Sequence, residues 1–164
     1  MSFKDIFQEE YSVVNSAHAR VNLIGEHTDY TGGYVLPSLL NFKTTIQISQ
    51  NNNKKYQVYS DNFDEQINFI DFIKSENIDW IDYVKGCLFV FYDENKQIPN
   101  THLNIFISSS IPMGRGISSS SALCVAILKT LNDFFKTQYS EKHIAILAQK
   151  VERNYIGVSG GIMD

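Results

Sequence analysis

The sequence has little of what marks a membrane, secreted or nucleic-acid-binding protein. No apolar stretch approaches the length that crosses a bilayer, and the opening residues, MSFKDIFQEEYSV, carry scattered charges in place of the basic flank and apolar run of a signal peptide. Lysine and arginine number 14 against 18 aspartate and glutamate residues, and no basic stripe that would bind nucleic acid is visible. We therefore expect a cytoplasmic protein with neither a nucleic acid nor a membrane as its partner.

Cysteine is also scarce. Cys87 and Cys124 are the two thiols, they are far apart, and both fall in apolar helical patterns. The sequence therefore predicts buried, reduced thiols without a chemical role. Apolar residues, in contrast, make up 43% of the 164 residues, which is enough for one domain with a substantial core.

Hydrophobic patterning predicts a single α+β domain over residues 1–164. Strands are expected at 13–17, 42–50, 56–60 and 103–108. Residues 80–92, WIDYVKGCLFVFY, suit a largely buried helix, although their aromatic density would also fit a strand. Further helices are expected after the serines at 118–121, which can cap a helix start, and from near Ser140 to just before Gly157.

A glycine-rich turn, PMGRGISSSSA at 112–122, lies between a predicted strand and a predicted helix. Glycines let backbone N–H groups converge, and the following helix adds the positive end of its dipole, so such a turn favours phosphate. The turn is not a Walker loop, because Ile117 follows Gly116 where that loop has lysine, and it lacks the third glycine of the dinucleotide fingerprint. The sequence therefore predicts a phosphate-binding turn of another kind.

Charged residues crowd into a second stretch, ARVNLIGEHTDYTGGY at 19–34, which holds Arg20, Glu26, His27 and Asp29. A metal site is disfavoured, because the other histidines are not arranged to complete one. The same groups could orient a small polyol through its hydroxyls, since a few convergent polar side chains suffice for that. A capped turn with satisfied polar groups is the simpler interpretation of this stretch taken alone.

Two further carboxylates are candidates on the last helix and beyond it. Glu152 falls at the edge of that helix's apolar face, where it could reach water, pair with a lysine, or bind magnesium together with phosphate oxygens. Asp164 follows a glycine-containing turn, where an aspartate is usually a turn residue or a helix cap.

Three motifs together resemble the galactokinases of the GHMP kinase family. HARVNLIGEHTDY is similar to the galactokinase signature, PMGRGISSSSA to the phosphate-binding motif of GHMP kinases, and VERNYIGVSGGIMD to the segment that carries the catalytic aspartate of galactokinases. WIDYVKG also resembles a galactokinase segment. The first motif discriminates, because the serine-rich turn alone would admit homoserine and mevalonate kinases. The resemblance implies most of a GHMP kinase N-terminal domain, with a mixed sheet packed against helices.

The resemblance implies a role for each matching position. Asp164 would be the base that takes the proton of the sugar C1 hydroxyl, and Arg20 the cation beside it. By the same resemblance, galactose would be contacted by Glu26, His27, Asp29 and Gly161. The ATP phosphates would be contacted by Gly114, Gly116, Ser118 and Ser119, and Mg²⁺ would be bound by Ser120 and Glu152. Trp80 and Tyr83 would lie near the adenine, although an aromatic pair at this spacing more often belongs to the core.

The implied function is galactokinase activity, in which the γ-phosphate of ATP is transferred with Mg²⁺ to the C1 hydroxyl of D-galactose to give galactose 1-phosphate, the first committed step of galactose metabolism. The chain departs from the family at His18-Ala19, where Pro-Gly is usual, and at Ser159-Gly160, where Pro-Cys is usual.

The chain stops at Asp164, before the third glycine-rich motif and the C-terminal domain of the family. We expect that domain to be absent here and to pack on this one in a complete enzyme, so the isolated chain should show little or no turnover. A non-catalytic galactose- and ATP-binding module, another GHMP-family small-molecule kinase and a structural fragment that binds neither ligand stay open as alternatives.

Overall fold

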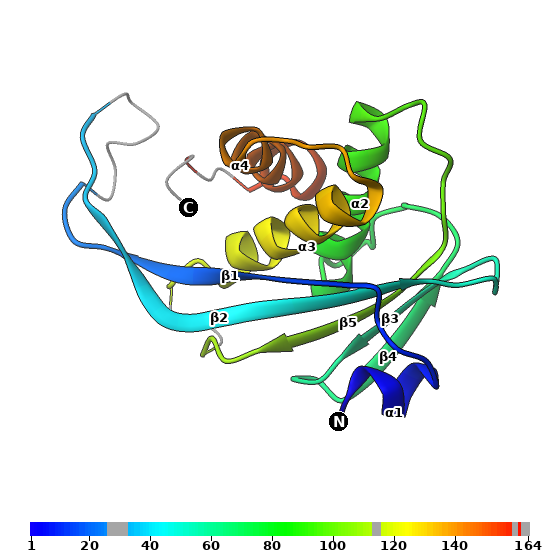
Figure 1. Ribbon diagram of the computed structural model, residues 1–164. Helices are drawn as coiled ribbons and strands as arrows, with labels where there is room; N and C mark the ends of the chain where they lie inside the picture. The colour runs from blue at the N-terminus through cyan, green and yellow to red at the C-terminus, as the bar shows by residue number, and fades with distance from the viewer. Residues whose placement is uncertain (26–32, 113–115, 159–160, 162–164) are drawn as a thin grey trace.

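The computed structural model of the chain describes residues 1–25, 33–112, 116–158 and 161. In these residues one mixed sheet lies beneath a layer of helices (Figure 1). The sheet has the strand order β1-β2-β5-β3-β4, in which β3 and β5 run parallel and the other neighbours antiparallel. The strands are β1 (Val13–Asn22), β2 (Pro37–Gln50), β3 (Tyr56–Ser60), β4 (Glu65–Phe69) and β5 (Leu103–Ser109). The α+β fold expected from the sequence is confirmed.

Most of the helices cover one face of this sheet, and a short helix lies on the other (Figure 1). The covering layer is formed by α2 (Trp80–Glu94), α3 (Ser119–Phe135), α4 (Glu141–Lys150) and a π-helical turn, η2 (Val151–Ile156), while α1 (Phe3–Phe7) packs beneath the sheet. The central strand β5 is therefore buried on both faces. Its Ile105 and Ile107 join the core under the helices, and its Phe106 packs against Phe3 of α1.

The predicted elements are found, with two additions. The strand expected at 56–60 is β3, the other three lie within β1, β2 and β5, and residues 80–92 are helical. Reciprocal capping decides the start of α2, because the side chain of Asp79 accepts from the helix backbone and that of Asp82 accepts from the Asp79 N–H. The additions are α1, which Ser2 and Asp5 cap in the same way, and the short edge strand β4.

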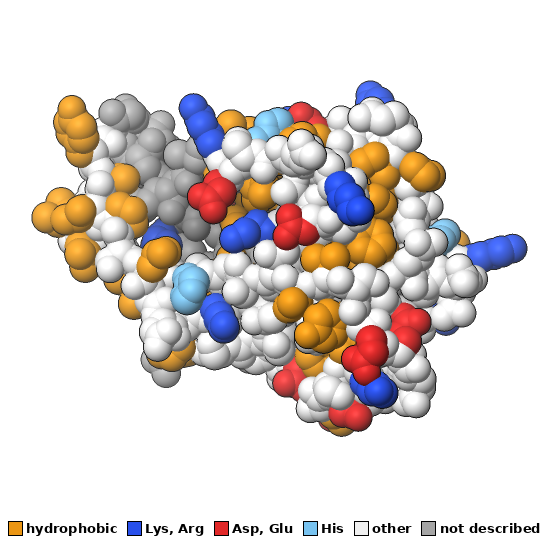
Figure 2. All heavy atoms as spheres, viewed as in Figure 1, with side chains coloured by type: hydrophobic (Ala, Val, Ile, Leu, Met, Phe, Trp, Pro, Cys, Tyr) orange, Lys and Arg blue, Asp and Glu red, His pale blue; other side chains and the backbone are white. Residues whose placement is uncertain are grey.

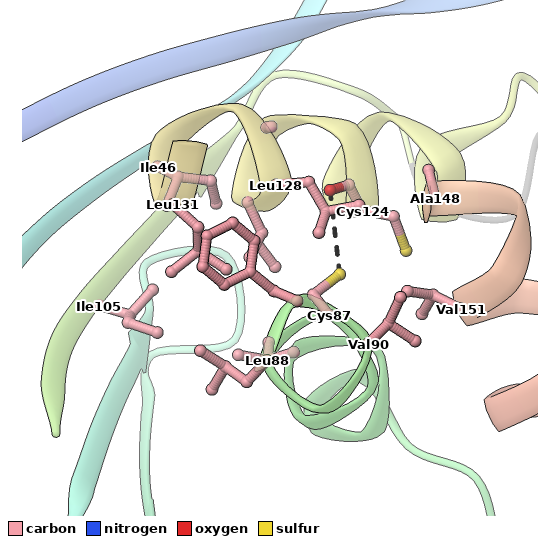
Figure 3. Close-up of a cluster of buried hydrophobic side chains, with 14 of the residues drawn as sticks. Ile46, Cys87, Leu88, Val90, Ile105, Cys124, Leu128, Leu131, Ala148 and Val151 are labelled. Atoms are coloured by element: carbon pink, nitrogen blue, oxygen red, sulfur yellow. Dashed lines mark hydrogen bonds between the residues drawn. The ribbon is translucent and has the colours of Figure 1, made fainter. Parts of the chain in front are cut away.

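The two cysteines lie where helices α2 and α3 meet in the core (Figure 3). Both are fully buried and free, and the Sγ of Cys87 lies 3.8 Å from the backbone oxygen of Cys124. The contact with Cys87 and burial together raise the pKa of the Cys124 thiol well above its usual value. The prediction of buried, reduced thiols is confirmed.

Hydrophobic side chains gather at the end of the molecule where β1 ends and β2 begins (Figure 2). This apolar end patch consists of Leu23, Ile24, Tyr34, Leu36 and Leu39, which are 54% to 100% exposed. Contiguous exposed apolar surface of this kind marks a place of contact with another polypeptide or ligand. None of the described helices is long and apolar enough to cross a membrane.

Candidate phosphate and cation site

The glycine-rich turn feeds directly into helix α3. Gly116 and Ser118 both have left-handed backbone, with φ of 65° and 56°, and the first helical hydrogen bond runs from the Ala122 N–H to the Ser118 oxygen at 3.0 Å. Ser118 is thus the N-cap residue, although with left-handed backbone where a serine cap is usually extended. The first turn of α3 consequently presents its backbone N–H groups and three consecutive serines at the end of the turn. Gly114 lies outside the described residues.

The side chain of Glu152 joins this first turn from η2. The hydroxyl of Ser120 donates to Glu152 Oε1 at 2.8 Å, and the hydroxyl of Ser121 lies 3.1 Å from each carboxylate oxygen. Glu152 is only 6% exposed, and no lysine or arginine in the described part of the chain forms an ion pair with it. Of the alternatives open from the sequence, exposure to water and pairing with a lysine are both wrong for this side chain.

A pocket of about 500 Å³ opens beside these serines. Ser119 and Ser120 line one side of it, and Trp80, Tyr83 and Phe63 line another. The rings of Phe63 and Trp80 are stacked, with centroids 5.7 Å apart and an angle of 16° between their planes. The pocket thus combines aromatic faces with a helix N-terminus, which suits a molecule that has a flat ring at one end and phosphates at the other.

Trp80 and Tyr83, which the resemblance puts near the adenine, pack against the core, as an aromatic pair at this spacing usually does, and also line this pocket. Phe63, which precedes β4, lines the pocket with them and was not among the predicted residues. The local sequence around Phe63, SDNFDEQ, gives no sign of a site. Burial raises the pKa of the Tyr83 phenol, and the neighbouring Cys124 and Glu152 act in the same direction. The Tyr83 phenol is protonated at neutral pH, as tyrosine ordinarily is, and its hydroxyl can serve as a hydrogen-bond donor at the pocket wall.

A second, much smaller pocket of about 30 Å³ lies behind Glu152. Ser121, Glu152 and Gly161 share it with side chains from α3 and α4. The structure therefore brings Gly161, one of the positions implied to contact the sugar, next to one of the positions implied to bind the cation.

Arg20 lies on β1 at an irregularity of the sheet. The pairing of β1 with β2 shifts register between His18, opposite Lys43, and Arg20, opposite Leu39. Such irregularities bend a strand locally and redirect its side chains. Ala19, which stands where the family usually has glycine, is fully buried and lies outside the positive-φ region, so alanine carries no strain there.

Four of the side chains implied to act on the sugar, Glu26, His27, Asp29 and Asp164, lie outside the described residues. The described positions are therefore mainly those that the resemblance assigns to the nucleotide and the cation, together with Arg20 and Gly161.

The geometry of Ser120 and Glu152 fits a magnesium ion. Adjacent ligands of an octahedral Mg²⁺ lie about 3 Å apart, because each stands about 2.1 Å from the ion. The 2.8 Å between Ser120 Oγ and Glu152 Oε1 is close to that spacing, and both atoms are the oxygen donors that Mg²⁺ takes together with phosphate. These two side chains would hold the ion next to any phosphates bound at the start of α3.

Residues 82–164 match the family model described as the GHMP kinases N terminal domain, and residues 1–50 match the one described as the galactokinase galactose-binding signature. The chain belongs to the GHMP kinase family, and it corresponds to the N-terminal part of its relatives.

Within that family, galactokinases are similar to the chain in amino-acid sequence. It is 40% identical to the galactokinase of Clostridium acetobutylicum over 99% of this chain and 42% of the relative, and 42% identical to that of Pyrococcus furiosus over 88% and 40%. The crystal structure of Lactococcus lactis galactokinase complexed with galactose superimposes with a TM-score of 0.90 at 34% identity, over 99% of this chain and 43% of that one. A mevalonate kinase with a TM-score of 0.82 at 23% identity shares the fold. The chain spans less than half the length of these galactokinases.

Proposed function

We propose that this chain is part of a galactokinase, which phosphorylates the C1 hydroxyl of D-galactose with ATP, and that its described residues include those that hold the nucleotide and the cation. The observation that supports the proposal most strongly is the contact between Ser120 and Glu152 at the edge of the 500 Å³ pocket. The contact joins two residues 32 positions apart, both of which the galactokinase resemblance independently assigns to the cation. The similarity to galactokinases supports galactose over the other substrates of GHMP kinases.

In the proposed binding mode, ATP places its base against Trp80 and Phe63 and its phosphates at the start of α3. Backbone N–H groups of the first turn, with Gly114, Gly116, Ser118 and Ser119, hold the phosphate oxygens. Ser120 and Glu152 hold Mg²⁺, which when bound offsets negative charge on the phosphates. The protein contributes position and charge, which are the main requirements of phosphoryl transfer.

On the acceptor side, we propose that Glu26, His27, Asp29 and Gly161 orient galactose through its hydroxyls. Asp164 accepts the proton of the C1 hydroxyl while that oxygen forms a bond to the γ-phosphorus and the bond from phosphorus to ADP breaks. Arg20 keeps the Asp164 carboxylate ionised, because a nearby cation favours the charged form.

The proposed nucleotide mode is tested by isothermal titration of the 164-residue chain with ATP, with and without Mg²⁺. We expect Mg²⁺ to tighten ATP binding about tenfold in the wild type and not at all in Glu152→Gln. Trp80→Ala should weaken binding under both conditions, because it removes a stacking surface. Asp93→Asn on the exposed side of α2 is the control and should match the wild type. Absence of ATP binding, or equal binding with and without Mg²⁺, would contradict the proposal.

We further propose that a second domain packs on this one in a complete enzyme, and that the enzyme works in the cytoplasm. The chain spans about 42% of its relatives, and the apolar end patch offers a surface for the remainder. The packing of a second domain can be tested by sedimentation velocity. This chain is mixed with the portion of the Clostridium acetobutylicum galactokinase that it does not match. We expect the two polypeptides to associate, and we expect Leu39→Ser and Ile24→Ser to weaken that association. If this chain associates only with itself and not with the added portion, the assignment of the apolar end patch is wrong.

Turnover is expected to be low for the 164-residue chain by itself, since a site open to water does not fix the acceptor. A radiolabelled ATP assay with galactose measures it directly. Transfer at the rate of a galactokinase of full length would show that this expectation is wrong.

A further inference from the structure

Ser121 differs from its neighbours in the serine run by where its hydroxyl lies. Ser119 and Ser120 line the large pocket, whereas Ser121 lines the small pocket behind Glu152 and is buried. Its Oγ is 3.1 Å from Glu152 Oε1 and 3.1 Å from Oε2, and no other hydrogen bond of this hydroxyl is found among the described residues. The Ser121 hydroxyl therefore binds the carboxylate and does not face the large pocket.

The carboxylate needs such support, because its last side-chain torsion is broad and its charge is buried. The terminal torsion of a glutamate side chain is broad, and the Ser120 hydroxyl reaches only Oε1. The Ser121 hydroxyl lies within hydrogen-bond distance of both oxygens and so limits how far the carboxylate can move from the start of α3. It also supplies hydrogen bonding to a carboxylate that no cationic side chain of the described residues neutralises.

We propose that Ser121 is a positioning residue for the cation site: it orients the Glu152 carboxylate so that Oε1 stays beside Ser120 Oγ at the spacing that adjacent Mg²⁺ ligands require. The proposal rests on the cation role proposed above for Ser120 and Glu152. When Ser120 turns a lone pair toward a cation, Ser121 remains as the donor that keeps the carboxylate in place. Partners that orient a metal ligand in this way commonly change metal affinity 10- to 100-fold when they are removed.

Two variants separate positioning from packing. Ser121→Ala removes the hydroxyl that bonds the buried carboxylate, so fold stability should fall, in part offset by the better helix propensity of alanine in the interior of α3. Ser121→Thr keeps the hydroxyl, and the 30 Å³ pocket beside it can admit the extra methyl group. A positioning role therefore predicts loss with alanine and rescue with threonine.

The test is electron paramagnetic resonance of Mn²⁺ titrated into the 164-residue chain with a non-hydrolysable ATP analogue, since the signal of free Mn²⁺ falls as the ion binds. We expect the Mn²⁺ dissociation constant to rise about tenfold in Ser121→Ala and to return to within about twofold of the wild type in Ser121→Thr. The thermal midpoint of Ser121→Thr should agree with that of the wild type within about 2 °C, and that of Ser121→Ala should be lower, because the buried carboxylate loses a hydrogen-bond partner.

The other outcomes are distinguishable. If the wild type binds no Mn²⁺, or Glu152→Gln binds it as the wild type does, the proposed cation site itself is wrong. If Glu152→Gln weakens binding and Ser121→Ala does not, only the role of Ser121 is overturned. Equal weakening by alanine and threonine, with lower thermal midpoints in both, would mean that Ser121 acts by packing and would also overturn the positioning role.

Discussion

Asp82 provides a quantitative test of how the pocket wall is held. Its side chain is fully buried at the start of α2, and it accepts from the Asp79 N–H at 2.9 Å, the Ser75 N–H at 3.0 Å and the Ser75 hydroxyl at 3.1 Å. Lys85 Nζ lies 3.8 Å away. These contacts tie the loop before α2 to the helix that carries Trp80 and Tyr83. The substitution Asp82→Ala should therefore loosen this wall of the pocket.

The expected cost follows from the donors left behind. Each buried donor without a partner costs about 1–3 kcal/mol, and loss of a capping interaction costs about 1 kcal/mol. Because the Ser75 hydroxyl can turn to water, we expect about 3 kcal/mol in total, or about 6–12 °C in the thermal midpoint of a chain of this size. Asp93→Ala on the same helix is the control: its pair with Lys96 is exposed, so it should change stability by less than about 0.5 kcal/mol.

The pH dependence gives an independent check. Burial by itself would raise the pKa of the Asp82 carboxyl, but the hydrogen bonds from Asp79 and Ser75, with Lys85 nearby, outweigh it and hold the pKa below its usual value. A lowered folded-state pKa means that the contribution is present above the unfolded value of about 3.9 and is lost as pH falls through the folded value. Wild type and Asp82→Ala should thus differ most near neutral pH and converge in acid.

Urea unfolding followed by circular dichroism at pH 7 and at pH 3 to 4 measures both quantities. An Asp82→Ala protein as stable as Asp93→Ala at pH 7, or a gap from the wild type that widens in acid, would refute this reasoning.

Three further predictions concern the core and the sheet. Cys87 and Cys124 should resist a thiol reagent in the native chain and react as two thiols in denaturant, because burial and a raised pKa of Cys124 suppress the thiolate; fast native labelling would contradict this. Gly86→Val should lower stability by about 2 kcal/mol in urea unfolding, since an added Cβ would meet side chains of η2 at 2.7 and 2.9 Å, and a neutral effect would show that η2 packs less closely. Asn22→Leu should not lower stability in the same assay, because both polar atoms of the Asn22 side chain are buried without a hydrogen-bond partner within the described residues; a loss above about 1 kcal/mol would mean that the amide is paired in solution.

The sequence sufficed for those elements whose pattern is local. The helical spacing that runs to Phe135 predicts α3, and the alternation in 103–108 predicts most of β5. In contrast, β4 is an edge strand of five residues with little apolar pattern, and it exists because it pairs with β3. The short helix α1 did carry a local signal, the Ser2 to Asp5 capping box, which the predictions did not use.

The burial of Glu152 could not be predicted from the helical pattern. A uniform 100° per residue puts it at the edge of the apolar face, but the helix widens to a π-helical turn at Val151, so the angular spacing changes at that point. Glu152 is consequently buried against α3. Its contacts with Ser120 and Ser121 span more than 30 residues, and a single sequence carries no local signal of them. The family resemblance supplied Ser120 and Glu152 by position, and only the fold adds Ser121.

The most direct test of the cation and phosphate site is a crystal of the chain grown with Mn²⁺ and a non-hydrolysable ATP analogue, examined by anomalous scattering at the manganese edge. The account predicts one strong anomalous peak within about 2.3 Å of both Ser120 Oγ and Glu152 Oε1, beside phosphates at the start of α3. Nucleotide bound in the pocket with manganese elsewhere, or with no protein ligand to the metal, would contradict it.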